Sequence, residues 1–193
     1  MKLRGLYAIT PEAADTVEKV RLALEGGVAL LQYRRKRRDL GEARAVAALA
    51  RRHGVPLIVN DDIELALELD ADGVHLGRDD GELGAARARL GDRILGASCY
   101  DDPELARRAV AAGADYVAFG SVFASPTKPA AVRAPLALFA TRLGVPLCAI
   151  GGITLENAPR ALGAGADLLA VVSDLFDAPD IRARAAQYQG LFA

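Results

Sequence analysis

The chain has 193 residues, a length typical of one domain, and 52% of them are apolar, which is enough for a core without disulfides or structural metals. Lys and Arg number 24 against 25 Asp and Glu, a formal net charge of -1 that argues against a nucleic-acid or membrane-surface binder. No apolar run approaches the roughly 18 residues of a membrane span, and no secretory signal precedes residue 20. We therefore expect a soluble cytoplasmic protein with one domain over residues 1–193.

Eight short apolar runs recur along the chain and predict strands. Most of them are continuously apolar rather than alternating, which is typical of strands buried on both faces of a parallel sheet. The runs span residues 5–9, 29–33, 57–60, 73–76, 94–98, 116–122, 147–150 and 168–172.

Amphipathic segments with helix start signals lie between these runs. Asp15 and Asp39 are each followed three residues later by glutamate, the spacing of a helix cap and its reciprocal partner. Asp102 precedes Pro103, and proline is favoured at the first helical position because its missing N–H needs no partner there. The three predicted helices end at glycines, namely Gly26 with Gly27, Gly54 and Gly113. Strands and helices therefore alternate along the chain.

An internal repeat accompanies this alternation. Ala-Asp pairs ending at Asp72, Asp115 and Asp167 precede three of the predicted strands, at intervals of 43 and 52 residues. A period near this length, with two strand–helix units in each repeat, gives eight units and predicts an α/β fold, a single (β/α)8 TIM barrel. The alternative is an open doubly wound sheet, which usually has fewer strands and a glycine-rich first turn that residues 7–11 lack.

In such a barrel, functional groups lie at the C-terminal ends of the strands. Five basic residues occupy positions 34–38 after the second predicted strand, and Lys128 follows the sixth. Cations at a helix start oppose the helix dipole unless an anion lies among them, so this run indicates either a phosphate-rich ligand or a solvated helix start. Strand alternation places Gln32 and Arg34 on the same side of the barrel mouth.

Acidic side chains follow the next two predicted strands. Asp61 and Asp80 lie close to the basic run in this arrangement. Aspartate after a strand often caps a helix, but one or two carboxylates with phosphate oxygens also form the usual site for Mg²⁺. The acids therefore indicate either helix caps or a magnesium site.

Small residues follow the last two predicted strands. Gly151 and Gly152 indicate either a tight turn that needs positive φ or, with Ser173, a phosphate site built from backbone N–H groups. His53, His75 and the two cysteines are interpreted as structural residues, since none has the partners of a Ser-His-Asp or Cys-His arrangement.

Several short motifs occur in one order over almost the whole chain. They are Gly5-Leu6-Tyr7-Ala8-Ile9-Thr10, Gln32-x-Arg34-x-Lys36, Asn60-Asp61, Asp72-Gly73-Val74-His75-Leu76-Gly77-x-x-Asp80, Gly96-x-Ser98, Ser125-Pro126-Thr127-Lys128 and Ala149-Ile150-Gly151-Gly152-Ile153-Thr154. In this combination the chain resembles the thiamine-phosphate synthase family. The resemblance implies a barrel enzyme that uses Mg²⁺ to join 4-amino-2-methyl-5-hydroxymethylpyrimidine diphosphate to 4-methyl-5-(2-phosphoethyl)thiazole, carboxylated or not, forming thiamine phosphate and pyrophosphate.

The resemblance also implies roles for individual residues, carried over by position. Ligands of the magnesium ion are Asp61 and Asp80. Contacts to the pyrimidine diphosphate come from Gln32, Arg34, Lys36, Asn60, Ser98 and Lys128, of which Arg34, Lys36, Ser98 and Lys128 are also expected to assist catalysis. Contacts to the thiazole phosphate come from Ser125, Thr127, Gly152, Val172 and Ser173.

Two departures from the family pattern and two alternative functions remain. Ser125 stands where Thr is common, which keeps a hydroxyl, and the N-terminus is shorter than usual, which bears on homo-oligomerisation. A related thiazole tautomerase has a histidine in the turn after the sixth strand, where this chain has Ser121. An inert sensor of phosphate ligands would not need both Asp61 and Asp80. The expected partners are small phosphorylated molecules, and neither nucleic acid nor a membrane.

Overall fold

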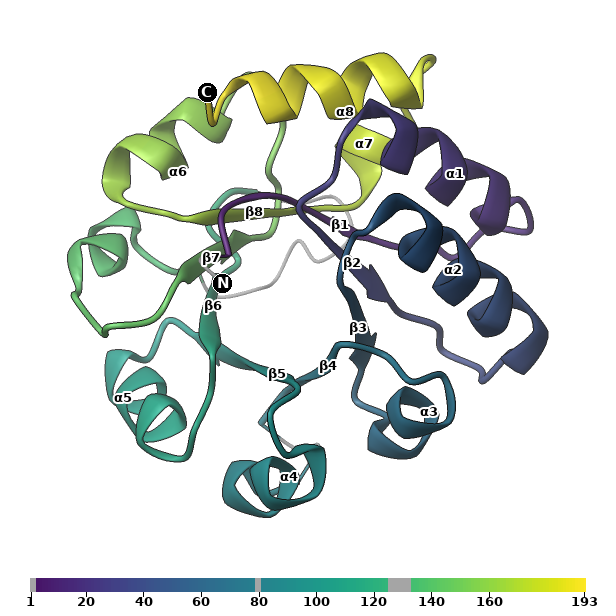
Figure 1. Cartoon of the computed structure of the whole chain (residues 1–193). Helices are drawn as coiled ribbons and strands as arrows, with labels where there is room; N and C mark the ends of the chain where they lie inside the picture. The colour runs from purple at the N-terminus through teal and green to yellow at the C-terminus, as the bar shows by residue number, and fades with distance from the viewer. Residues whose placement is uncertain (1–2, 79–80, 125–132) are drawn as a thin grey trace.

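The computed structural model describes residues 3–78, 81–124 and 133–193 of the chain. Eight parallel strands form a closed barrel in which each strand pairs with the next and β1 pairs with β8 (Figure 1). The predicted (β/α)8 barrel is therefore confirmed, and the open sheet is wrong. The strands are β1 (Gly5–Ile9), β2 (Leu30–Tyr33), β3 (Leu57–Asn60), β4 (Gly73–Leu76), β5 (Ile94–Tyr100), β6 (Tyr116–Gly120), β7 (Leu147–Ile150) and β8 (Leu168–Val171).

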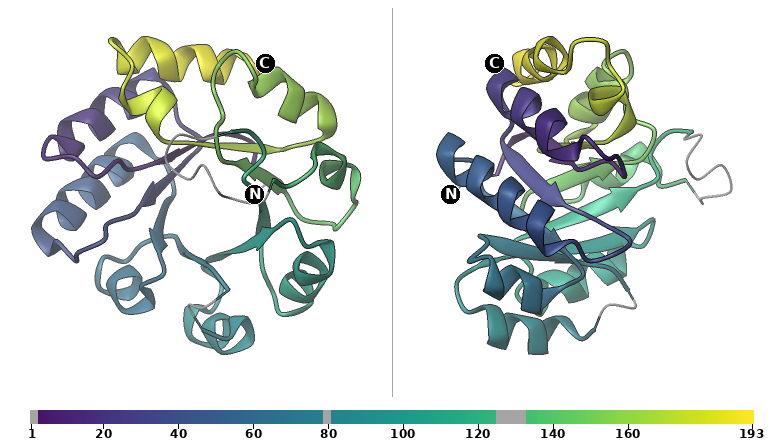
Figure 2. Two further views of the ribbon diagram at one scale, coloured as in Figure 1. Left: turned by 180° about the vertical axis from the view of Figure 1, so that it is seen from behind. Right: turned by 90° about the vertical axis from the view of Figure 1, so that its right-hand side faces the viewer.

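Helices surround the barrel on its outside, as the side view of Figure 2 shows. A 3-10 helix, η1 (Leu136–Ala140), takes the place of the α-helix expected between β6 and β7, and a short extra helix precedes the last one. The α-helices are α1 (Thr16–Gly26), α2 (Leu40–His53), α3 (Ile63–Glu68), α4 (Leu83–Leu90), α5 (Pro103–Ala111), α6 (Ala158–Ala164), α7 (Ser173–Phe176) and α8 (Ile181–Gly190). None of the helices in the described ranges is long and apolar enough to cross a membrane.

Four strands differ at their ends from the prediction. Strand β5 continues past Ser98 because a register shift lets Tyr100 pair with Phe119 of β6. Strand β6 ends at Gly120 rather than at residue 122, and the Val122 N–H then makes a single bond to β7. Strands β2 and β8 are each one residue shorter than predicted. Such differences arise from hydrogen bonding between strands, which a hydrophobic pattern does not report.

Two of the three predicted helix caps are confirmed. The carboxylate of Asp39 accepts the N–H of Glu42, and that of Asp102 accepts two N–H groups from the first turn of α5. Asp15 directly precedes α1, as predicted, but its side chain makes no capping bond, because its backbone (φ -99°, ψ 22°) lacks the extended conformation of a capping residue. Its carboxylate instead lies 3.7 Å from the Lys19 ammonium group.

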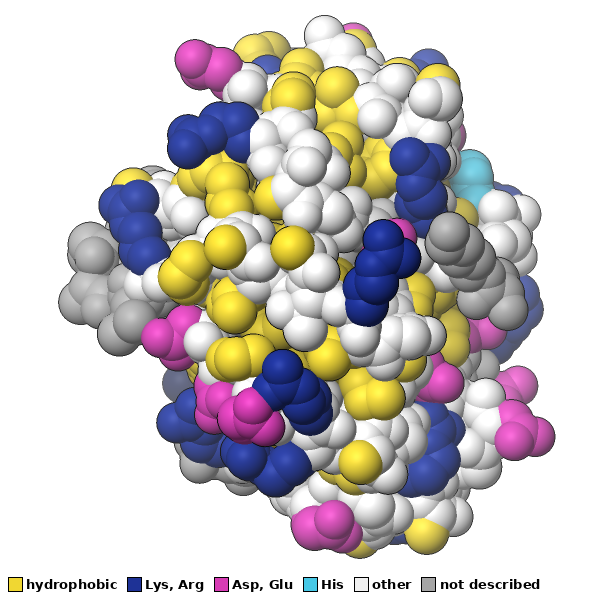
Figure 3. Space-filling view, turned by 90° about the vertical axis from the view of Figure 1, so that its left-hand side faces the viewer, with side chains coloured by type: hydrophobic (Ala, Val, Ile, Leu, Met, Phe, Trp, Pro, Cys, Tyr) yellow, Lys and Arg dark blue, Asp and Glu magenta, His cyan; other side chains and the backbone are white. Residues whose placement is uncertain are grey.

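The core has two layers. A larger one, rich in Val, Leu and Ala, fills the space between the strands and the helices, and a smaller one fills the barrel itself. Tyr7, Leu30, Ile58, Tyr116 and Leu168 are among the buried residues of the inner layer. On the face that carries α5, α6 and η1, hydrophobic side chains lie among charges of both signs (Figure 3). The charged side chains on the described part of that face are therefore of both signs.

The repeated Ala-Asp pairs have a structural role at the N-terminal end of the barrel. Each aspartate directly precedes an even-numbered strand, and its carboxylate accepts a backbone N–H near the start of the preceding odd-numbered strand. The bonds join Asp72 to Leu57 (2.8 Å), Asp115 to Leu95 (2.8 Å) and Asp167 to Leu147 (3.0 Å). The aspartates of the repeat thus join consecutive parallel strands by hydrogen bonds.

Candidate active site

The opposite, C-terminal end of the barrel holds the predicted site. Of the residues assigned to it, those within the described ranges lie near the ends of the strands, in the loops that follow or, for Ser173, at the start of α7. They are Gln32, Arg34, Lys36, Asn60, Asp61, Ser98, Gly152, Val172 and Ser173. The remaining assignments, Asp80, Ser125, Thr127 and Lys128, lie outside the described residues.

A chain of polar side chains crosses the interior of the barrel and links two of the predicted site residues. The Gln32 amide donates to the Tyr7 hydroxyl at 2.7 Å, and the hydroxyls of Tyr7 and Tyr116 lie 2.7 Å apart. The Tyr116 hydroxyl is 2.9 Å from His75 Nδ1, and His75 Nε2 is 2.8 Å from the Ser98 hydroxyl. Gln32 and Ser98, from β2 and β5, are therefore connected through three residues.

Burial keeps both phenols of this chain protonated, because it raises the pKa of Tyr7 and of Tyr116 well above the ordinary value for tyrosine. Tyr7 accepts from Gln32, and His75 is held through both of its ring nitrogens, by the Tyr116 hydroxyl and by the Ser98 hydroxyl. The hydrogen-bonded series therefore ends at the Ser98 hydroxyl on β5.

A glycine leaves room for the hydrogen-bonded side chains in the barrel interior. A Cβ atom at Gly96 of β5 would lie 2.1 Å from Cζ of the Tyr116 ring, a separation that atoms of two side chains do not reach. The Tyr116 ring also packs against His75, with ring centroids 5.5 Å apart. The Gly96-x-Ser98 motif therefore combines a ring-sized gap with the hydroxyl at the end of the chain.

A cavity of about 530 Å³ lies where β2 and β3 end and is lined by Lys36, Asn60 and Asp61, together with Arg35 and other residues of these loops, the start of α3 and Arg89 of α4. Asp61 has a left-handed backbone (φ 63°), its N–H donates to the His75 carbonyl at 2.9 Å, and its carboxylate accepts the Asn60 amide at 2.5 Å. The cap of α3 is the next residue, Asp62, whose carboxylate accepts from Leu65. The helix-cap interpretation of Asp61 is therefore wrong.

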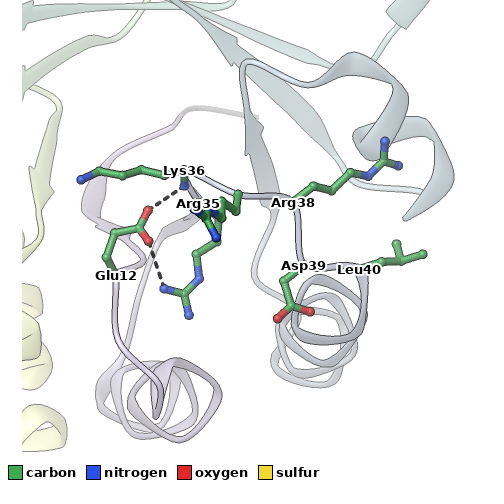
Figure 4. Close-up of a pocket in the computed structure, with 7 residues that line it drawn as sticks. Glu12, Arg35, Lys36, Arg38, Asp39 and Leu40 are labelled. Atoms are coloured by element: carbon green, nitrogen blue, oxygen red, sulfur yellow. Dashed lines mark hydrogen bonds and ion pairs between the residues drawn. The ribbon is translucent and has the colours of Figure 1, made fainter.

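A second cavity, of about 580 Å³, lies behind the basic run. It is lined by Glu12 from the loop after β1 and by residues 35–40 (Figure 4). Arg34 and Lys36 are exposed, whereas the Arg35 side chain between them is only 14% exposed. The basic run is thus not a uniformly solvated helix start, because one of its members is anchored in the fold.

The loop after β7 has the tight turn that its glycines predict. Gly152 has φ 64°, and a Cβ atom there would lie 2.3 Å from the Ala124 carbonyl oxygen, so only glycine fits. The Asn157 side chain holds this turn by donating to the Gly152 carbonyl and by accepting the Thr154 N–H, both at 2.9 Å. Ser173, after β8, is exposed. The turn is confirmed, and the phosphate site stays a prediction.

Sequence reasoning missed several residues at this end. The positions of Tyr7, His75 and Tyr116 in the barrel interior follow from the two-residue alternation of each strand, but their mutual hydrogen bonds do not. Tyr100, exposed at 39% with the Arg78 guanidinium 4.7 Å from its ring centroid, carries no signal in the sequence. Cys99 is buried, which raises the pKa of its thiol to about 12, so it is no nucleophile near neutral pH.

Comparisons with known proteins agree with this architecture. A family model for thiamine monophosphate synthase matches residues 6–175. The thiamine-phosphate synthases of Aromatoleum aromaticum and Methylobacillus flagellatus are 63% and 54% identical, over 99% and 98% of this chain and 97% and 96% of those proteins.

A solved structure is similar as well. The thiamine phosphate pyrophosphorylase from Pyrococcus furiosus has a TM-score of 0.87 and 34% identity, over 99% of this chain and 96% of that one. Its likeness therefore extends from the first strand to the last helix. With its closed barrel, its polar mouth and these full-length relatives, the chain belongs to the thiamine monophosphate synthase family of enzymes.

Proposed function

We propose that this chain joins a hydroxymethylpyrimidine diphosphate to a thiazole phosphate and releases pyrophosphate, forming thiamine phosphate. The single observation that carries the proposal is the cavity that brings Lys36, Asn60 and Asp61 together. It adjoins the interior polar chain, because the Asp61 N–H bonds the carbonyl of His75. Cations, a carboxylate and neutral donors in one place suit a ligand with a charged diphosphate and a polar ring.

The chemical difficulty of this reaction is the departure of pyrophosphate, which carries several negative charges. Lys36 and Arg34 are exposed cations on the loop after β2, and they would bind the diphosphate and stabilise the charge that develops on it. Ser98 and Gln32, at the two ends of the interior hydrogen-bonded series, would orient the pyrimidine. These groups are positioned before the substrate arrives, which lowers the cost of orienting it.

The described residues fit a magnesium ion at the mouth. Asp61 contributes a carboxylate to the cavity, whereas the carboxylate of Asp62 is engaged in capping α3. The described ranges contain no group of three or more His, Cys, Asp or Glu side chains suited to a metal, but Mg²⁺ needs only one or two carboxylates where phosphate oxygens and water complete its shell. When bound there, Mg²⁺ supplies positive charge that offsets the charge of the leaving pyrophosphate.

The thiazole phosphate would bind across the mouth, at the loops after β7 and β8. The Gly152 turn brings the backbone close to its neighbours, and the Ser173 hydroxyl is exposed beside Val172. Small residues and backbone N–H groups in such loops commonly bind phosphate in (β/α)8 barrels. The two substrates would then approach each other from opposite sides of the same opening.

The reaction needs no general base, because the thiazole nitrogen carries no proton to remove. This agrees with a site in which both nitrogens of His75 are hydrogen-bonded and the thiol of Cys99 is buried. We expect a dissociative path, in which the bond to pyrophosphate breaks first and the electron-rich pyrimidine carries the positive charge until the thiazole captures it.

A direct assay tests the proposed function. The purified chain, both substrates and Mg²⁺ should yield thiamine phosphate and pyrophosphate in equal amounts, and EDTA should abolish both products. Conversion of the thiazole phosphate alone into a tautomer, with no pyrophosphate released, would instead support the tautomerase. Binding of both substrates without any turnover would support a sensor of phosphate ligands.

The dissociative path has its own test. An electron-withdrawing substituent on the pyrimidine ring should slow the single-turnover rate at saturating substrate by several orders of magnitude, because it destabilises the cation. Each factor of ten corresponds to about 1.4 kcal/mol of barrier. The matched comparison is a substituent of similar size without electron withdrawal. A decrease of less than about tenfold would indicate direct displacement.

A further inference from the structure

Arg35 separates two residues assigned to the diphosphate but differs from both in its surroundings. Its side chain is 14% exposed, whereas Arg34 and Lys36 are exposed. A guanidinium this deeply placed requires partners, since an unpaired buried charge is costly. Figure 4 shows that Arg35 and Lys36 leave the loop in different directions, with Glu12 beside them. Arg35 is therefore largely buried in the fold, whereas its two neighbours are exposed.

The Arg35 guanidinium forms hydrogen bonds with two parts of the fold that flank the loop after β2. On one side it meets Glu42 of α2, with Nε donating to Oε1 at 2.6 Å and Nη2 paired with Oε2. On the other side it meets the segment between β1 and α1. Its partners there are the carbonyls of Pro11 (3.4 Å) and Ala13 (2.6 Å), the hydroxyl of Thr16 (3.1 Å) and the carboxylate of Glu12 (3.3 Å).

That segment in turn holds the backbone on each side of Arg35. The Thr10 hydroxyl accepts the Arg34 N–H at 2.9 Å and donates to the Arg34 carbonyl at 3.0 Å. The Glu12 carboxylate accepts the Lys36 N–H at 2.7 Å. This bond, together with the one from Arg35, lowers the pKa of Glu12, so the acceptor stays ionised near neutral pH. Three consecutive residues are thus anchored to one segment.

From this geometry we propose that Arg35 is a positioning residue, which holds the exposed cations of Arg34 and Lys36 in place for the diphosphate without touching it. The proposal rests on the proposed function. Arg35 borders both cavities, but its charge is compensated by Glu42 and Glu12. Its contribution is to fix a loop that carries adjacent like charges, which would otherwise move apart and have to be ordered on binding.

The first measurement is the affinity for inorganic pyrophosphate with Mg²⁺, by calorimetry, in Arg35→Met. We expect weakening of about tenfold to about a hundredfold, because small misplacements of binding groups have effects of that size. The matched control is Arg44→Met, which removes an exposed guanidinium paired with Glu68 at 3.1 Å from the same helix that carries Glu42. The control should bind like the wild type. Unchanged affinity in Arg35→Met would overturn the proposal.

The second measurement separates positioning from direct binding. In the double variant Arg35→Met with Lys36→Met, the loss caused by Arg35→Met should be much smaller than in the wild-type background, since one of the groups it positions is already gone. Independent, additive losses would overturn the proposal. The KM for the pyrimidine diphosphate should rise in Arg35→Met more than that for the thiazole phosphate, a split that general destabilisation would not produce.

Backbone exchange supplies a readout that does not depend on ligand. The amides of Arg34 and Lys36 should exchange faster with deuterium in Arg35→Met, and at the wild-type rate in Arg44→Met. If wild-type protein fails to bind pyrophosphate, the proposed function is contradicted, and this exchange still decides whether Arg35 anchors the segment. Should Arg35→Met not fold, Thr10→Val removes the hydroxyl that holds Arg34 without changing charge. It should weaken pyrophosphate binding in the same direction, and wild-type affinity there would overturn the proposal.

Discussion

The two ends of the barrel use aspartate for different purposes. At the N-terminal end, Asp72, Asp115 and Asp167 each accept a backbone N–H of a neighbouring strand. At the mouth, Asp61 accepts the Asn60 side-chain amide and lines a cavity. The same carboxylate is therefore part of the fold at one end and faces the candidate site at the other.

Backbone polarity explains the difference. At the N-terminal end the three aspartates accept N–H groups near the starts of strands, whereas at the mouth side-chain donors complete backbone carbonyls of the loops. At the mouth, the Thr10 hydroxyl donates to the Arg34 carbonyl and the Arg35 guanidinium donates to the Ala13 carbonyl. Several acids at this end also serve the fold, such as Asp62 and Asp102 as helix caps, whereas Asp61 lines the cavity.

The largest difference between the two ends is expected in turnover, when one carboxylate is removed from each end in turn. Asp61→Ala should lower pyrophosphate release by about a hundredfold to about a thousandfold, the usual effect of losing one group that stabilises developing charge. Asp72→Ala, at the opposite end, is the matched control and should turn over at close to the wild-type rate. Thermal unfolding of Asp61→Ala should match that of the wild type. Near-wild-type turnover in this variant would show that Asp61 has no part in catalysis.

The opposite pattern is expected for stability. Asp167→Ala leaves the Leu147 N–H without its acceptor and should lower the free energy of unfolding by about 1–3 kcal/mol. Denaturant titration measures this change, and kcat should stay close to that of the wild type. Asp167→Asn keeps an acceptor oxygen, so it should lose less. A large fall in kcat without loss of stability would mean that Asp167 contributes to catalysis and not to stability.

The smallest effect is expected at Asp102, a carboxylate at the C-terminal end of the barrel that stabilises the fold. Hydrogen bonds from the Leu105 and Glu104 N–H groups lower the pKa of Asp102, the cap of α5. Its stabilisation is therefore complete above the ordinary pKa of aspartate and is lost as the pH falls through the lowered pKa of the folded state. The difference in unfolding free energy between wild type and Asp102→Asn should narrow as the solution is acidified from neutral pH. A difference that is constant with pH would contradict this role.

Local patterns predicted the barrel and the end of it at which the candidate site residues lie. Continuous apolar runs and the Ala-Asp repeat indicated eight strand–helix units, and the ends of those strands located Gln32, Asn60 and Asp61. The sequence patterns failed where two neighbouring residues suited the same structural role equally well. Asp61 and Asp62 are both acceptable caps by sequence, and the structure chooses Asp62 because Asp61 takes a left-handed backbone and bonds β4 through its N–H.

What the sequence determined by itself is the order of the elements, the fold class and the edge of the barrel at which polar residues gather. These features depend on periodicity and on the direction of parallel strands, both of which are local. Only the tertiary structure decided that Gln32 and Ser98 are joined through Tyr7, Tyr116 and His75, and that Arg35 is largely buried while Lys36 is exposed. Those relations join residues far apart in the chain. They depend on barrel closure, which fixes the distances between side chains from different strands and loops.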